Sequence, residues 1–180
     1  MAQRLFVAVE IPSAIRERLD RLPHDLRGAR WVKVDQMHLT LRFIGDVEPE
    51  VGARIAGALA TLQFPRFELT VRGAGVFPSP HKPRVLWVGI DPRPEIPALK
   101  AGIDAVIEVP DDEAGRPFHP HLTLARLREA DRSDVQVVLQ KLEKLTFEPF
   151  WVDHFTLFES ELGRDGAKHR VVQTYSLRPQ

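Results

Sequence analysis

The 180-residue chain contains no cysteine. Without thiols it cannot form disulfide bonds, thiolate nucleophiles, iron–sulfur clusters or cysteine-based zinc sites. It also lacks an excess of either charge, because 25 Lys and Arg residues balance 25 Asp and Glu residues. Proteins that grip long nucleic acids without sequence preference usually present a basic domain, so the balance argues against that class. A small site for one or two phosphates remains possible.

Long hydrophobic runs are absent too. Arg4, Glu10 and Pro12 interrupt the apolar N-terminal segment, which therefore differs from a signal peptide. No window approaches the roughly 18 apolar residues that a membrane-spanning helix needs. The content of 43% hydrophobic and 28% charged residues is typical of a folded globular protein. We therefore expect a cytoplasmic protein without membrane contact.

Segments with strand-like and helix-like hydrophobic spacing are interleaved along the chain. Strands are expected at 4–10, 38–43, 67–72, 84–90, 118–127, 150–158 and 170–177, and helices after Pro12, after Pro49, at 96–107 and from a cap at Ser133 or Asp134, with turns at 45–46 and 163–166. Several strands follow one another directly, which favours an α+β fold with largely antiparallel sheets over a parallel, Rossmann-type sheet. No linker divides the chain, so residues 1–180 are expected to form a single domain.

One four-residue motif occurs twice. His-Leu-Thr-Leu stands at residues 38–41 and again at 121–124, both times in a segment expected to be a strand. Successive side chains of a strand point to opposite faces, so the His and Thr of each copy share one face and the leucines share the other. The leucines can pack beneath helices, which leaves two polar pairs free to line a cleft.

Paired imidazole and hydroxyl groups suit phosphodiester cleavage. Histidine titrates near pH 6.5, so one imidazole can take a proton from water while the other donates to a leaving oxygen, each contributing about 10²–10⁴-fold. Threonine hydroxyls can bind phosphate oxygens, and an arginine can neutralise charge in the transition state. A single His-Leu-Thr-Leu string is most often structural, but two copies, each followed by an arginine, favour catalysis without a metal.

Two arginines are candidates for the phosphate. Arg42 is in phase with His38 and Thr40, so regular strand alternation places it on their face. Arg126 is out of phase with His121 unless the strand ends or bulges before it. Strand parity alone therefore favours Arg42, and the choice between the two stays open.

Further candidates have structural alternatives. His119 and His121 have a spacing that metal sites use, but the third ligand would have to be His38, Asp35 or Asp46, which are poor options. Phe118, Trp31 and Phe43 are aromatic residues near the motifs that could stack on a base. Core packing is the commoner fate of such residues, and Phe43 faces the core unless its strand bulges. Phe118 is retained among the substrate-binding candidates.

The chain resembles the two-histidine phosphoesterase superfamily, and more closely the RNA 2′,3′-cyclic phosphodiesterases, also called 2′-5′ RNA ligases. The resemblance rests on the paired His-x-Thr-x motifs and runs nearly end to end. It includes the blocks RLFVAVEIP, MHLTLRFIGDV, PRVLWVGI and FHPHLTLARL, and the final strand with Tyr175-Ser-Leu177.

This resemblance implies two pseudo-symmetric lobes with mainly antiparallel sheets around a central cleft and helices on the outside. It implies hydrolysis of 2′,3′-cyclic phosphate ends of RNA to 2′-phosphomonoesters, without metal or other cofactor, and a reversible 2′-5′ joining of RNA ends. His38 is then the proton donor and His121 the proton acceptor, while Thr40 and Thr123 hold phosphate oxygens. It also favours Arg126 over Arg42.

The expected partners are RNA ends or nucleotides that bear a 2′,3′-cyclic phosphate, bound by a monomer. One alternative is a phosphodiesterase of small nucleotides, such as a cyclic phosphate of ADP-ribose or a 2′-5′ oligonucleotide. Another is an RNA-binding or ligation-assisting module without turnover. Binding alone does not require both histidines and both threonines, which argues against the last alternative.

Overall fold

A computed structural model describes residues 1–23, 25–111, 113–163 and 166–179 of the chain. In chain order its elements are β1 (Gln3–Glu10), α1 (Ser13–Asp20), β2 (Ala29–Trp31), the 3₁₀ helix η1 (Val34–Gln36), β3 (His38–Val47), α2 (Pro49–Leu59), β4 (Phe67–Leu69), β5 (Val71–Ser79), β6 (Lys82–Ile90), α3 (Glu95–Val106), β7 (His121–Leu127), α4 (Arg132–Glu143), β8 (Phe150–Val152), β9 (His154–Gly163) and β10 (Gly166–Ser176).

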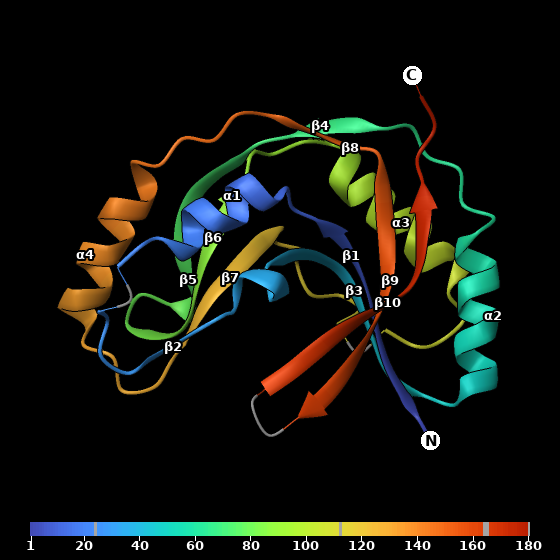
Figure 1. Ribbon diagram of the computed structural model, residues 1–180, viewed down its shortest axis with the longest axis horizontal. Coiled ribbons are helices and arrows are strands. Elements are labelled where there is room, and N and C mark those ends of the chain that lie inside the picture. Colours follow the sequence, from blue (N-terminus) through green and yellow to red (C-terminus); the bar gives the residue numbers. More distant parts are fainter. Residues whose placement is uncertain (24, 112, 164–165, 180) are drawn as a thin grey trace.

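Among the described residues, two four-stranded sheets have the strand orders β10-β9-β1-β3 and β2-β7-β6-β5. Neighbouring strands in both sheets pair antiparallel. Figure 1 shows one lobe with α2 and α3 at the right and another with α1 and α4 at the left. The paired strands β4 and β8 run across the top between the two lobes. This arrangement confirms the expected α+β fold with two lobes.

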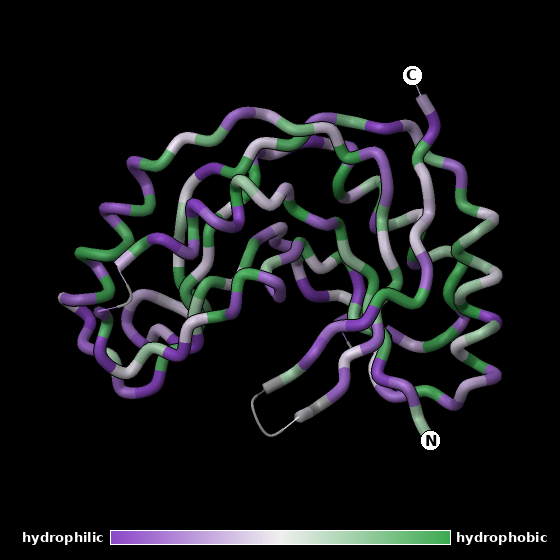
Figure 2. Tube along the Cα trace, viewed as in Figure 1, coloured by the Kyte–Doolittle hydropathy of each residue, from purple (hydrophilic) through white to green (hydrophobic). Residues whose placement is uncertain are grey.

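The helices form where apolar residues recur at helical spacing. Pro49 occupies the first turn of α2, where a missing N–H costs nothing, and Ile55 and Leu59 are buried against the sheet. In α4 the cap is Asp131, whose side chain accepts a hydrogen bond from the Ser133 backbone N–H at 2.7 Å, and not Ser133 or Asp134 as expected. Figure 2 shows hydrophobic and hydrophilic residues alternating along both helices.

Several strand boundaries differ from the expectation. The expected strand 67–72 divides at Thr70 into β4 and β5, and the expected strand 150–158 divides at Asp153 into β8 and β9. In each case one apolar run serves two ladders, first the β4–β8 ladder and then a main sheet. The expected turn at 45–46 is part of β3, and β7 begins at His121 rather than at residue 118. Part of the expected turn at 163–166, Arg164 and Asp165, lies outside the described residues.

The motif leucines lie in the main core. Leu39, Leu41, Leu122 and Leu124 are at most 2% exposed. A second, smaller apolar cluster of Phe6, Ala8 and Phe158 lies apart from this core. It belongs to β1 and β9, the two central strands of their sheet. No helix in the described ranges combines the length and apolarity needed to cross a membrane.

Candidate active site

The two motif strands have the same local irregularity. In β3, Thr40 pairs with Ala8 and Arg42 pairs with Val7, so Leu41 is an extra residue without a partner in β1. In β7, Thr123 pairs with Trp87 and Ala125 pairs with Leu86, so Leu124 is the extra residue. Each strand therefore has a bulge at the fourth position of its motif. The order of buried and exposed side chains is identical over 38–44 and 121–127.

The bulge decides which side chains accompany the histidines. Val85, Trp87 and Gly89 share one face of β6, and they lie opposite Arg126, Thr123 and His121 respectively. Directly opposed residues of an antiparallel pair share a face, so Arg126 lies on the same face as its motif histidine and threonine.

The same register in the other lobe pairs Phe43 with Phe6 and His38 with Glu10. Phe43 therefore shares the face of His38, and its side chain is 56% exposed. Arg42 lies on the opposite face. The expectation that Arg42 shares the face of the motif is wrong, because the bulge at Leu41 inverts the alternation.

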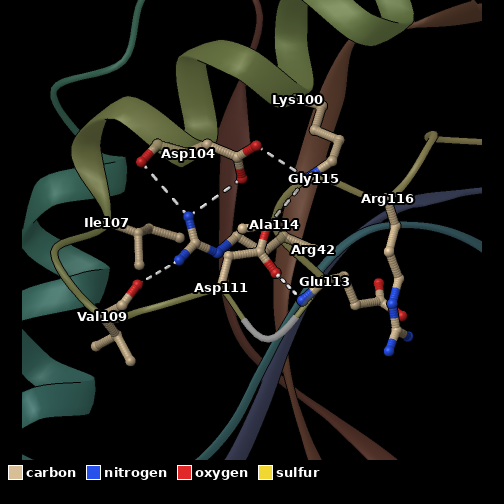
Figure 3. Close-up of a pocket in the computed structure, with 10 residues that line it drawn as sticks. All are labelled: Arg42, Lys100, Asp104, Ile107, Val109, Asp111, Glu113, Ala114, Gly115 and Arg116. Atoms are coloured by element: carbon tan, nitrogen blue, oxygen red, sulfur yellow. Dashed lines mark hydrogen bonds and ion pairs between the residues drawn. The ribbon is translucent and has the colours of Figure 1, made fainter.

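Arg42 has a structural role instead. Its side chain is 3% exposed and forms an ion pair with Asp104 of α3 at 3.1 Å, and it donates a further hydrogen bond to the carbonyl of Val109 (Figure 3). Lys100 contacts the other oxygen of Asp104 at 2.9 Å. Arg42 therefore links β3 to α3 on the face of the sheet opposite the motif side chains. For this reason Arg42 is not part of the proposed substrate site.

We expect Arg42→Met to lower the free energy of unfolding by about 2–3 kcal/mol, because it leaves the Val109 carbonyl and Asp104 without their buried partner. Lys100→Met is the matched control and costs less than about 1 kcal/mol, since that pair is partly exposed. Urea unfolding measures both. At a temperature where both variants are folded, kcat/KM stays within about twofold of the wild type; a selective loss of activity in Arg42→Met would return Arg42 to the substrate site.

His38 lies in a cluster of rings. It stacks on Phe6 with ring centroids 4.9 Å apart, and Phe158 is 5.9 Å away. His169 of β10 packs edge-on against it at 5.0 Å. Burial, followed by the positive charge of His169, lowers the pKa of His38 from 6.5 to about 3. His38 is therefore neutral near pH 7 in the free protein.

The hairpin β9–β10 brings His169 to this position. Figure 1 shows the end of the hairpin extending from its sheet downward and to the left, toward the middle of the view. Gln36 of η1 donates a hydrogen bond to the Ala167 carbonyl, so β10 runs beside the segment that precedes His38. Burial also lowers the pKa of His169. The sequence gives no signal for this residue, because its place depends on the curvature of the hairpin.

His121 is oriented by its own backbone. Its Nδ1 lies 2.6 Å from the carbonyl oxygen of His119, which can only accept a hydrogen bond, so Nδ1 carries the proton. In the neutral ring Nε2 is then free to accept a proton. Phe77 packs edge-on at 4.9 Å and Trp87 lies 6.2 Å away. The His38 ring likewise bonds the backbone two residues earlier, at Gln36.

The motif strands β3 and β7 contact each other, which brings the two halves of the site together. Thr40 and Thr123 are both partly buried. Within the described part of the chain their hydroxyls have no hydrogen-bond partner, so both are available to a ligand. Glu10 also faces this side, and its carboxylate contacts His154 and Thr156, each at 3.1 Å.

Two aromatic candidates do not lie on the motif face. Phe118 packs against the core, and the Lys100 ammonium lies 5.6 Å from its ring centroid. Trp31 pairs with Ala125, whose side chain points into the core. We therefore leave Phe118 out of the proposed substrate site. In the described ranges no three His, Asp or Glu side chains are arranged to hold a metal ion.

Comparison with known proteins matches this architecture. The family model of LigT-like phosphoesterases matches the chain twice, over residues 9–87 and 90–169, and each match contains one motif. The RNA 2′,3′-cyclic phosphodiesterase of Thermus thermophilus is 36% identical over 191 residues, covering 97% of this chain and 90% of its own. The protein of the same name from Escherichia coli is 30% identical over 186 residues and 97% of both chains.

Solved structures agree with the sequence comparison. Thermus thermophilus TT0787 superposes with a TM-score of 0.80 at 30% identity, covering 98% of this chain and 99% of its own. Escherichia coli LigT complexed with 3′-AMP gives a TM-score of 0.75 at 28% identity with the same coverage. The repeated family match and the end-to-end relatives show that the chain belongs to the LigT-like phosphoesterase family.

Proposed function

We propose that the protein is an RNA 2′,3′-cyclic phosphodiesterase that forms 2′-phosphomonoesters without a metal. The observation that carries this proposal is the duplicated bulged strand, which presents a His and a Thr from each lobe on one face. Relatives that cover nearly the whole chain are RNA 2′,3′-cyclic phosphodiesterases. Since both motifs belong to one chain, we propose that residues 1–180 act as one two-lobed domain and as a monomer.

In the proposed reaction a water oxygen attacks phosphorus and the bond from phosphorus to the 3′ oxygen breaks. His121 takes the water proton at Nε2, because a backbone carbonyl holds its Nδ1–H. His38 donates a proton to the departing 3′ oxygen. Thr40 and Thr123 bind the non-bridging oxygens, and Arg126 neutralises charge that builds up in the transition state. An RNA 5′-hydroxyl in place of water would give a 2′-5′ linkage by the same steps.

His38 must acquire its proton in the complex. In the free protein burial and His169 keep its pKa at about 3. A cyclic phosphate carries one negative charge, and a negative charge beside an imidazole favours its protonated form. The bound substrate therefore brings a negative charge next to His38 and raises its pKa in the complex.

The decisive experiment is incubation with adenosine 2′,3′-cyclic phosphate in excess EDTA, with the product identified by ³¹P NMR. We expect adenosine 2′-phosphate to form at the same rate with and without EDTA, because both proton transfers use imidazole groups. Formation of the 3′-phosphate would contradict the assigned leaving group. Abolition by EDTA would contradict metal-free catalysis, and the absence of any product would support a binding module instead.

A further inference from the structure

Two arginines face each other beside the motif of the second lobe. Arg30 of β2 lies directly opposite Arg126 of β7 in their antiparallel ladder, so the two side chains share the face of His121. Like charges directly opposite one another destabilise a strand pair, and β2 offers only three residues of pairing against this cost. Both side chains are exposed, and neither has an ion-pair or hydrogen-bond partner among the described residues. No carboxylate of the described residues therefore neutralises these two neighbouring positive charges.

The described residues of the other lobe include no such pair. Its motif strand β3 is an edge strand in this part of the chain, so no described strand takes the position that β2 occupies beside β7. At the site equivalent to Arg126, the sixth residue of the strand, β3 carries the exposed Phe43. The pseudo-symmetry of the site is broken at this position, which carries an arginine in one lobe and a phenylalanine in the other.

Arg126 and Arg30 together supply two guanidinium groups, whereas a single cyclic phosphate carries only one negative charge. Arg126 is next to the motif, and Arg30 lies one strand farther out, a spacing of about 4.8 Å between strands. Guanidinium groups bind phosphate oxygens in bidentate geometry. The outer arginine therefore suits a second phosphate group that is covalently linked to the first.

We propose that Arg30 binds the phosphodiester that precedes the terminal nucleotide, so that the site takes an RNA end of at least two nucleotides in preference to a mononucleotide. This inference rests on the proposed function and adds the direction of the chain: the RNA leaves the site over β2. With a net charge of zero over the whole chain, this contact is a local one and not part of a long basic groove.

The test compares adenosine 2′,3′-cyclic phosphate with the dinucleotide ApA that ends in a 2′,3′-cyclic phosphate. For the wild type, we expect kcat/KM to be about tenfold higher for the dinucleotide, and Arg30→Ala to abolish most of this preference by raising KM. Arg30→Lys should retain part of it, because the charge remains but the bidentate geometry is lost. The matched control is Arg132→Ala, which removes an exposed arginine at the start of α4 and should leave the preference unchanged.

The salt dependence gives a second readout. Each phosphate that a protein neutralises on a single strand contributes a slope of about −0.7 to a plot of log affinity against log salt. The slope for the dinucleotide should become shallower by about 0.7 in Arg30→Ala. An unchanged substrate preference, or an equal loss for both substrates, would overturn the proposal, since the latter means that Arg30 only supports Arg126.

Failure of the proposed function has a different outcome. If the wild type cleaves neither substrate, calorimetric titration with the 3′-phosphorylated dinucleotide and with adenosine 3′-phosphate still tests the site. The inference is supported if Arg30→Ala weakens binding of the dinucleotide but leaves binding of adenosine 3′-phosphate unchanged. Equal binding of both ligands by wild type and variant would reject it.

Discussion

Replacing either motif histidine by alanine is expected to lower kcat for a 2′,3′-cyclic nucleotide by about 10²–10⁴-fold, the usual contribution of a positioned acid or base. His121→Ala removes the proposed proton acceptor, whose Nδ1–H donates to the His119 carbonyl. His38→Ala removes the proposed proton donor, which contacts the rings of Phe6 and His169. The double variant should lose less than the product of the two single losses, because the groups act as a unit.

Steady-state kinetics at saturating substrate measures this result, with thermal unfolding to show that each variant is folded. His81→Ala is the control, since His81 is exposed in the turn between β5 and β6. The two-histidine mechanism fails if either motif variant keeps full activity. A higher KM with an unchanged kcat would assign the histidines to substrate binding instead of catalysis.

Acidification between pH 6.5 and pH 3 is expected to destabilise the wild type through His38. The pKa of this residue is about 3 in the folded protein and 6.5 without its surroundings. Between these values the unfolded chain binds a proton that the folded protein does not, so stability falls as the pH is lowered. One such proton corresponds to a slope of about 1.4 kcal/mol per pH unit.

Urea unfolding at several pH values between 4 and 7 measures the slope, and His38→Gln should flatten it by this amount. Groups around His38 also contribute to its pKa: the charges of His169 and Arg16 lower it, whereas a hydrogen bond to the Gln36 backbone raises it. His169→Phe keeps a ring in place but removes the charge, so it should narrow the pH window without abolishing the slope. Equal slopes in wild type and His38→Gln would show that His38 is not held neutral.

The same pKa separates the two possible roles of His38. In the His121→Ala variant, His38 is the one motif histidine that remains, so the residual kcat/KM follows its protonation state. If His38 donates, the residual activity rises about tenfold for each pH unit between 6.5 and 3, in the direction of falling pH, because only the protonated ring is competent. A flat profile over this range would reverse the roles of the two histidines.

Local patterns in the sequence predict most of the elements, and they predict which motif side chains share a face. The alternation of His38, Leu39 and Thr40 is enough to place imidazole and hydroxyl on one face and leucine on the other. The same alternation fails after Leu41, where the bulge exchanges the faces of Arg42 and Phe43. A bulge depends on how β3 pairs with β1, and that pairing is not encoded in the period of a single strand.

Other parts of the site depend on long-range geometry. His169 reaches His38 because the β9–β10 hairpin curves toward η1. The sequence around His169 does not indicate this contact. Arg30 gains significance only from its register opposite Arg126. Both residues come from segments that read as ordinary polar sequence, so their roles emerge from tertiary structure alone.

The strand order has a consequence for how the enzyme can be assembled. Each half of the chain contains one family match and one motif, yet β1 pairs with β9, so that Leu5 lies opposite Glu159, about 150 positions away. Contacts at such separation close large loops and make folding slow compared with proteins of local topology. Neither half on its own contains the strands that complete its sheet. The two His-Leu-Thr-Leu motifs are therefore brought together only once the two ends of the chain have paired.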